Sequence, residues 1–204
     1  MTIDFQKIHK TLVEKSKDFV FLKNQIKLNK AITIKNTKLD FFMYISKIII
    51  SQQISNKVAE KIWNEFCSNY KKKELSSKVF SKKSHLLDAL KIVKISGKKK
   101  TYIEGIYDSI SEKKIIPDEL HLQPDLKLRN QLESFNGIGS WTADNMLIFF
   151  FKRLNIFPRD DLVIKKVISK ITEKEGREID FCSLFTPFLS ILSLHFWKMS
   201  KRIL

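Results

Sequence analysis

Residues 132–166 read LESFNGIGSWTADNMLIFFFKRLNIFPRDDLVIKK, and rare glycines, a proline and paired acids crowd together in this stretch. The chain has 204 residues but only five glycines, and Gly137 and Gly139 are two of them. The pattern predicts a helix, a glycine turn, a second helix, a short loop and a third helix that opens on Asp160 and Asp161. Two rare glycines so close together indicate that the backbone of the turn requires them.

Helical periodicity continues on both sides of this stretch. Apolar residues recur at intervals close to 3.6 residues along most of the chain, which is typical of amphipathic helices. Only residues 31–34 are β-branched enough to be extended, and they predict a link and not a sheet. The sequence therefore predicts an all-α protein of one compact unit, with room for two lobes. The other helices are expected at 5–28, where Asp18 caps the second of two, and at 39–51, 54–66, 85–93, 102–110, 128–135, 163–171 and 181–192.

The charge is strongly unbalanced. The chain has 38 Lys and Arg residues and 22 Asp and Glu residues, which gives a net charge of +16. Such a balance favours a polyanionic partner, with nucleic acid first. An anionic membrane surface and a general lysine bias are the alternatives, and each lysine cluster by itself is typical of a solvated face. The clusters lie at 71–73, 82–83 and 98–100.

Cysteine usage and hydropathy argue against a zinc site, an iron–sulfur cluster and a membrane-spanning segment. Cys67 and Cys182 are isolated, so the chain lacks the grouped cysteines of a zinc site or an iron–sulfur cluster. The first residues contain no apolar signal segment, and the longest apolar run, 146–151, is too short to cross a bilayer. We therefore expect a cytoplasmic protein with reduced thiols and no membrane association.

The glycine turn suggests a phosphate contact. Backbone N–H groups at the start of the second helix have no helical partner and lie at the positive end of its dipole. Ser140 and Thr142 add hydroxyl groups beside Gly137 and Gly139. The alternative is an ordinary helical hairpin closed by a glycine cap.

The paired acids suggest chemistry. An aspartate at a helix start is most often a cap, and one cap needs only one acid. If Asp160 caps the third helix, Asp161 lies in the first turn, where the dipole keeps its carboxylate ionised and able to face a developing positive charge.

Taken together, GIGSWTADNMLIF, FPRDD and the upstream ISQQIS resemble the helix-hairpin-helix superfamily of DNA glycosylases. Within it, the chain is most similar to the 3-methyladenine DNA glycosylase II family, from about residue 39 to the C-terminus. The resemblance implies a two-lobed, all-α catalytic unit without an N-terminal β domain, with the flipped base held between the lobes. Lobe one would comprise about 1–38 and 135–204, and lobe two about 39–134, including the helix that enters the hairpin.

The resemblance also implies roles for matching residues. Asp161 matches the catalytic aspartate, which stabilises the oxocarbenium-like sugar as the N-glycosidic bond breaks. Trp141 and Trp197 match tryptophans near the base pocket, although core packing is the common role of tryptophan at helical spacing. His195 reads as a core histidine and not a catalytic one. The positions implied to contact DNA are Gly137, Gly139, Ser140, Thr142, Gln52 and Gln53.

Gln52 and Gln53 match the loop that inserts a side chain into the gap left by the flipped base, and a polar helix end is the alternative. No cofactor is required by the resemblance. The hairpins of this family often bind Na⁺ or K⁺ through main-chain oxygens, which here would be those of Glu133, Phe135 and Ile138.

The departures from the family pattern refine the expected reaction. Bifunctional glycosylase-lyases carry a lysine where this chain has Trp141, so no Schiff-base nucleophile is expected there and the abasic site should be left intact. Asn145 and Leu162 replace two tyrosines of relatives, which leaves the damaged base open.

The predicted function is therefore monofunctional hydrolysis of the N-glycosidic bond of alkylated purines, such as 3-methyladenine, by base flipping in base excision repair. The partner is double-stranded DNA with damaged bases, bound by a monomer that associates with the nucleoid through DNA. The alternatives are a non-catalytic DNA-binding helix-hairpin-helix protein and a glycosylase for an oxidised or deaminated base.

Overall fold

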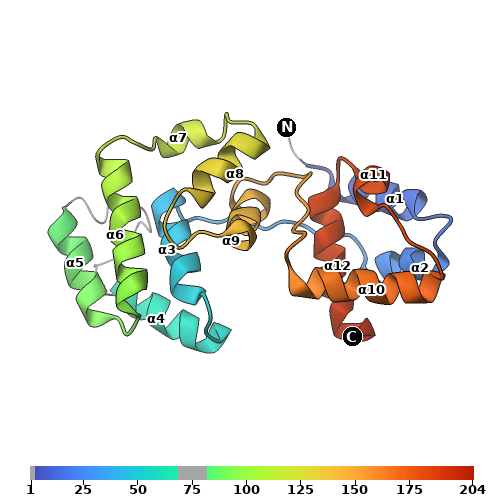
Figure 1. Cartoon of the computed structure of the whole chain (residues 1–204), viewed down its shortest axis with the longest axis horizontal. Helices are drawn as coiled ribbons and strands as arrows, with labels where there is room; N and C mark the ends of the chain where they lie inside the picture. Colours follow the sequence, from blue (N-terminus) through green and yellow to red (C-terminus); the bar gives the residue numbers. More distant parts are fainter. Residues whose placement is uncertain (1–2, 69–81) are drawn as a thin grey trace. The chain divides into compact units, whose positions relative to one another are not determined.

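The computed structural model describes residues 3–68 and 82–204, and every regular element in that part of the chain is a helix (Figure 1). The predicted all-α class is confirmed. The lysine cluster at 71–73 lies outside the described residues. The elements are α1 (Phe5–Lys15), α2 (Val20–Asn29), α3 (Phe41–Ser51), α4 (Asn56–Ser68), α5 (Lys83–Ile92), α6 (Gly97–Ser111), α7 (Pro117–Leu120), α8 (Asp125–Glu133), α9 (Ser140–Asn145), the π-helical turn η2 (Met146–Phe150), α10 (Leu162–Glu175), α11 (Phe181–Phe185) and α12 (Leu189–Ile203).

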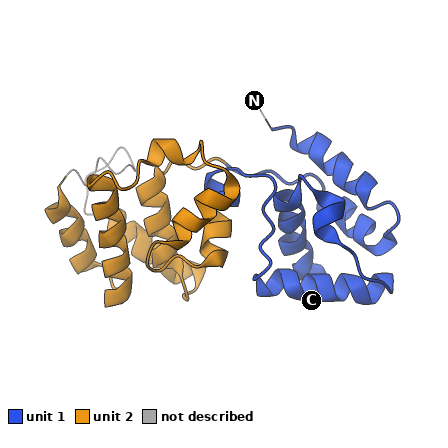
Figure 2. Ribbon diagram, turned by 45° about the horizontal axis from the view of Figure 1, so that its top comes forward, with its two compact units in different colours: residues 1–35, 147–204 blue, residues 36–146 orange. Residues whose placement is uncertain are grey.

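The chain forms two compact units (Figure 2). Unit 1 combines Met1–Lys35 with Leu147–Leu204, and unit 2 is Asn36–Met146. The sequence predicted that the chain returns to lobe one at about residue 135. In the structure it returns to unit 1 at Leu147. The physical reason is that α9 packs against α8, so the whole hairpin stays in unit 2.

Unit 1 is built on α10, which packs against α2 and α12. Asp4 caps α1 by accepting a 2.9 Å hydrogen bond from the Lys7 N–H. Asp18 does not cap α2 as predicted, because the cap position is Phe19 and no side chain bonds there. Fully buried side chains of this unit include Leu12, Leu22, Ile26, Val167, Ile171, Phe185, Leu192 and Phe196.

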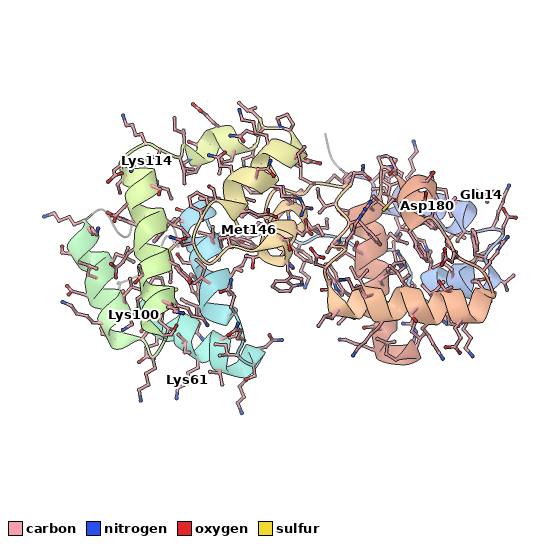
Figure 3. The ribbon with its side chains drawn as sticks, in the orientation of Figure 1. Glu14, Lys61, Lys100, Lys114, Met146 and Asp180 are labelled. Carbon is pink, nitrogen blue, oxygen red and sulfur yellow. The ribbon has the colours of Figure 1, made fainter. Side chains whose placement is uncertain are left out.

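Unit 2 is organised around α3, which packs against α4 and α6. The α3 helix begins where Asp40 Oδ1 accepts a 2.9 Å hydrogen bond from the Met43 N–H. Lysine side chains, among them Lys61 and Lys114, project outward from this unit (Figure 3). Its buried side chains include Phe42, Ile45, Ile49, Phe66, Leu86, Leu90, Ile103, Leu128 and Leu132.

The second helix of the hairpin is shorter than its sequence suggests. The α9 helix has six residues and then widens into the π-helical turn η2. Single π-helical turns occur often at functional sites. No helix in the described part of the chain is long and apolar enough to cross a membrane.

Candidate functional site

In the glycine turn between α8 and α9, position 137 requires glycine. This residue has φ +87°, and a Cβ added to it would collide with the Tyr102 ring. Gly139 has an ordinary φ of −93° and open space around it. As the N-cap of α9, Gly139 supplies no side chain to the first N–H groups of that helix, which leaves the turn smooth enough for a phosphate to approach.

The loop between α3 and α4 is tied to this turn by Gln52. Its Nε2 donates a 2.9 Å hydrogen bond to the Gly137 carbonyl and lies 3.4 Å from Thr142 Oγ1. Thr142 is only 4% exposed. Both side chains join the loop to the hairpin, and the DNA contacts expected of Gln52 and Thr142 stay predictions. Ser140, the first residue of α9, is half-buried.

Gln53 has a different environment from its neighbour. Its side chain is exposed, and its backbone is left-handed with φ +58°. The residue before it is held by Lys99, whose ammonium donates to the carbonyls of Ile50 at 2.8 Å and Gln52 at 2.7 Å. Burial lowers the pKa of Lys99. Of the two glutamines, Gln53 is the one whose side chain faces solvent.

A cavity of about 880 Å³ lies within unit 2 beside this loop. It brings together five predicted positions, namely Gln52, Gln53, Gly137, Trp141 and Thr142. Its wall also includes Asn145, one of the two departures from the tyrosines of relatives, and residues that the sequence analysis did not single out. The remaining lining residues are Thr37, Leu39, Tyr44, Lys47, Ile48, Ser51, Ile54 and Asn56.

The α3 wall of the cavity was missed because its residues look like one side of an ordinary buried helix. Tyr44, Lys47, Ile48 and Ser51 recur at the spacing of a single helix face, and that face leads to Gln52. This spacing could have shown from the sequence that the four residues lie on the same side as Gln52. Burial raises the pKa of Tyr44 to about 12, so its hydroxyl remains protonated at neutral pH.

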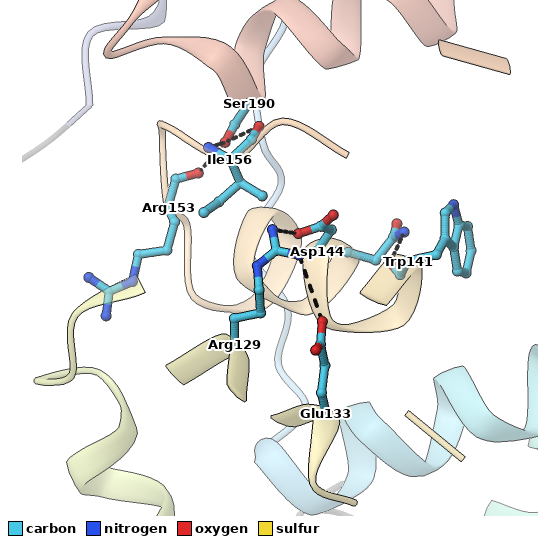
Figure 4. A network of polar contacts seen from close by, with 8 residues as sticks. Arg129, Glu133, Trp141, Asp144, Arg153, Ile156 and Ser190 are labelled. Atoms are coloured by element: carbon cyan, nitrogen blue, oxygen red, sulfur yellow. Dashed lines mark hydrogen bonds and ion pairs between the residues drawn. The ribbon is translucent and has the colours of Figure 1, made fainter. Parts of the chain in front are cut away.

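An ion-pair network fixes the hairpin (Figure 4). Arg129 of α8 pairs with Asp144 of α9, which is 3% exposed, and its other terminal nitrogen lies 3.8 Å from a Glu133 oxygen. A buried carboxylate needs such a partner. The network holds α9, and with it Trp141, against α8.

The main-chain oxygens expected to hold a cation lie at the end of α8 and in the turn that follows it. Glu133 is the last residue of α8, and Phe135 and Ile138 lie in the connection from α8 to α9. Phe135 O already accepts a 3.0 Å hydrogen bond from the Ile138 N–H, but a carbonyl has a second lone pair. Neutral carbonyl oxygens are hard donors that suit an alkali cation, so this donor set fits Na⁺ or K⁺. Within residues 3–68 and 82–204, no group of His, Cys, Asp and Glu side chains could hold a metal ion.

Asp161 lies in unit 1, at the start of α10. It is 7% exposed, and its Oδ1 accepts a 2.9 Å hydrogen bond from the Ile164 N–H. Asp161 is thus the helix cap itself, whereas Asp160 is exposed and lies 3.8 Å from the Lys165 ammonium. The condition that Asp160 would cap the helix is not met. The carboxylate of Asp161 still lies at the positive end of the α10 dipole.

The connection that leads to Asp161 is anchored by Ser190 of α12 (Figure 4). The Ser190 hydroxyl donates to the Arg153 carbonyl at 2.6 Å and accepts from the Ile156 N–H at 2.9 Å. The Asp161 N–H then donates to the Pro158 carbonyl at 3.1 Å. These bonds fix the backbone on which the Asp161 carboxylate is carried.

The two predicted pocket tryptophans lie in different units. Trp141, on α9, is 46% exposed and lines the cavity of unit 2. Trp197, on α12, is half-buried and stacks on Phe149, with ring centroids 5.9 Å apart. Trp197 therefore packs within unit 1, which is the alternative role that its helical spacing suggested.

His195 is a core histidine, as the sequence indicates. It is fully buried on α12, its Nδ1 lies 3.1 Å from Asn29 Nδ2, and its ring stacks on that of His9. Burial, followed by the nearby charges of His9, Lys198 and Arg202, lowers the pKa of His195 to about 3. The ring is neutral at physiological pH.

Comparison with known proteins identifies relatives of this chain. A DNA-3-methyladenine glycosylase of Saccharomyces cerevisiae is 30% identical over 143 residues, which are 67% of this chain and 48% of the yeast protein. The solved structure of a DNA-3-methyladenine glycosidase from Bacillus halodurans has a TM-score of 0.74 at 19% identity, covering 95% of this chain and 88% of that one. A Schizosaccharomyces pombe 3-methyladenine DNA glycosylase, solved in complex with abasic DNA, has a TM-score of 0.66 at 19% identity, covering 96% and 97%.

The chain spans about half of the Saccharomyces protein and 60% of a Bacillus subtilis relative. No protein-family model matches it. The predicted relationship to the DNA-3-methyladenine glycosylases is confirmed, and so is the predicted fold.

Proposed function

We propose that this chain, a relative of the DNA-3-methyladenine glycosylases with the helix-hairpin-helix glycosylase fold, hydrolyses the N-glycosidic bond of alkylated purines in double-stranded DNA. One observation carries the proposal most directly. In a chain of net charge +16, the carboxylate of Asp161 is 7% exposed at the start of α10. This aspartate matches the catalytic aspartate of the family that the sequence resembles, so we assign its carboxylate a role in the chemistry in addition to capping α10.

The role proposed for Asp161 is electrostatic. As the bond between base and sugar breaks, positive charge develops on the sugar, and a fixed carboxylate stabilises it. The effect is larger at a site with little water, because the local dielectric constant is lower. The cap bond from Ile164 and the Ser190 anchor keep the carboxylate in place, so little reorganisation is needed during the reaction.

The hairpin is proposed to bind DNA phosphate. The turn around Gly137 presents the N-terminus of α9 without a covering side chain at Gly139. A Na⁺ or K⁺ ion would be held by the main-chain oxygens of Glu133, Phe135 and Ile138, and when bound it supplies a positive charge for a phosphate oxygen.

Gln53 is proposed as the side chain that fills the gap left by the flipped base. Gln53 is preferred to Gln52 because the Gln52 amide already bonds to the hairpin. The exposed side chain and left-handed backbone of Gln53 support the assignment, since backbone strain in proteins is concentrated at functional positions.

Base recognition is proposed to use the exposed ring of Trp141. An N-alkylated purine is cationic, and its charge can stack on the electron-rich face of an indole. Asn145 donates its amide to the Trp141 carbonyl at 2.9 Å, so its oxygen is the group left to accept a hydrogen bond from a base. With Trp141 where lyases carry lysine, the product is proposed to be an intact abasic site.

The test is the release of free bases from duplexes that each carry one lesion. We expect the purified protein to liberate 3-methyladenine or a related alkylated purine, detected by chromatography, without cutting the strand. Release of only an oxidised or deaminated base would assign another lesion class. Strand cleavage at the abasic site would contradict the monofunctional assignment.

A second candidate function is DNA binding without catalysis. It is favoured by the two departures from the tyrosines of relatives, Asn145 in the cavity wall and Leu162, which is 73% exposed. Under this alternative the protein binds damaged or abasic duplexes, and no free base appears from any lesion in the panel.

A further inference from the structure

We propose that Lys99 is a positioning residue that sets the backbone of the intercalation loop, defined as residues 52–55, and thereby aims Gln53 at DNA. The inference rests on the proposed function in one respect, namely that this loop enters the duplex. Lys99 itself touches no reacting atom in this account. It acts through the main chain of α3 and through Gln52.

The contacts form a continuous brace from α6 to the hairpin. Lys99 Nζ donates to the carbonyls of Ile50 at 2.8 Å and of Gln52 at 2.7 Å. The Gln52 side chain continues the path by donating to the Gly137 carbonyl at 2.9 Å. A single ammonium therefore fixes the end of α3, and the residue it fixes is bonded to the turn proposed to bind phosphate.

The charge of Lys99 suits this place. The last carbonyls of a helix lack helical partners and form the negative end of its dipole, so a cation stabilises them. The Lys99 side chain is half-buried, and this burial lowers its pKa. Lys98, its neighbour on α6, is exposed. The two lysines differ in environment but carry the same charge at nearly the same place.

The loop needs such a brace because Gln53 is strained. A left-handed backbone is unfavourable for a residue other than glycine, and Gln53 has φ +58°. The loop is also held on its far side, where the Ala59 N–H donates to the Ser55 carbonyl at 2.9 Å. Gln53 thus lies between two anchored residues, with an exposed side chain. Loss of the Lys99 anchor would let the loop relax and the side chain change direction.

The expected consequence is specific to DNA with a gap in the base stack. A side chain that is already oriented loses less conformational entropy when it fills the gap. General attraction to phosphate depends on net charge and does not need the brace. Lys99 should therefore increase the preference for DNA with an abasic position over undamaged DNA, and a lysine elsewhere with the same charge should not.

The experiment compares Lys99→Met with Lys98→Met as a matched control. The Kd of the whole protein is measured for a duplex with a stable abasic-site analogue and for the undamaged duplex. We expect both variants to weaken binding to undamaged DNA equally. The ratio of the two Kd values should fall about tenfold in Lys99→Met and stay unchanged in Lys98→Met. Lys99→Arg, which can still donate to both carbonyls, should restore most of the ratio.

Several outcomes would overturn the inference. One is a ratio for Lys99→Met equal to that of Lys98→Met; another is a wild-type protein that does not prefer the abasic duplex. If Lys99→Met unfolds at the assay temperature, Lys99→Gln takes its place, and an unchanged ratio there also refutes the role. Base release is not needed for these measurements. A protein that prefers abasic DNA through Lys99 but releases no base would refute the proposed function alone.

Discussion

At the residue scale, neighbouring residues of the same type do different work in this chain. Gly137 needs a positive φ and space beside Tyr102, while Gly139 needs neither. Gln52 bonds to the hairpin, while Gln53 faces solvent. Asp161 caps α10, while Asp160 is exposed. Each pair offers a variant and its control one or two positions apart.

Gly137→Ala should destabilise unit 2. The new methyl group would collide with the Tyr102 ring, and alanine is strained at φ +87°. Together these effects should cost at least about 2 kcal/mol. Gly139→Ala has free space and an ordinary backbone, so its cost should stay below about 1 kcal/mol. Urea unfolding of the two variants measures the difference, and equal stability would contradict the distinction between the two glycines.

The paired acids, the glycine turn and the polar loop stand out in the sequence because each departs from the composition of the surrounding helices, and the role predicted for Asp161 follows from the resemblance to the glycosylase family. The sequence did not show that Gln52 and Thr142 are used internally. Their hydrogen bonds join segments that are distant in sequence, and a single sequence carries no signal of which donor meets which acceptor across a fold.

At the element scale, the hairpin depends on the packing of α8 against α9. The sequence predicted both helices from their periodicity, but not the shortness of α9 or the π-helical turn after it. The run from Met146 to Phe151 is apolar throughout, so it fits an α-helix and a π-helical turn equally well. Packing decides between them, and packing is not a local property.

Asp144→Ala should loosen the hairpin. It leaves the partly buried Arg129 guanidinium without its main partner, and breaking a buried ion pair costs roughly 3 kcal/mol. The double variant Arg129→Met with Asp144→Ala should be less destabilised than Asp144→Ala alone, because no unpaired charge remains. Thermal unfolding tests both, and a double variant at least as unstable as the single one would argue against this role of the pair.

At the scale of the whole molecule, the chain leaves unit 1 after Lys35 and returns at Leu147. The sequence predicted two lobes with a discontinuous first lobe. It misplaced the return because the boundary follows from the contact of α9 with α8 and not from a composition change. Unit 1 therefore combines the two ends of the chain around α10.

Unit 1 should lose stability in mild acid. The pKa of His195 is about 3 in the folded protein and near 6.5 when unfolded, so between these values the unfolded chain binds the additional proton. Stability is then present above pH 6.5 and is lost as pH falls, by about 2 kcal/mol between pH 7 and pH 5. The lowered pKa of His9, also caused by burial, acts in the same direction.

Urea unfolding at pH 7 and pH 5 measures this effect. His195→Leu should reduce the difference in unfolding free energy between the two pH values. If His195→Leu and the wild type lose the same stability between pH 7 and pH 5, His195 is not the cause of the acid sensitivity.

If the carboxylate of Asp161 drives base release, the two adjacent aspartates must differ sharply in their effect on the reaction. The rate of free base release from methylated duplex DNA is measured under single-turnover conditions for Asp161→Asn and Asp160→Asn. Asparagine also caps helices, so the fold should persist in both. We predict that Asp161→Asn lowers the rate about 100-fold or more while DNA affinity changes little, and that Asp160→Asn releases base at the rate of the wild type. Unimpaired release by Asp161→Asn would contradict the account.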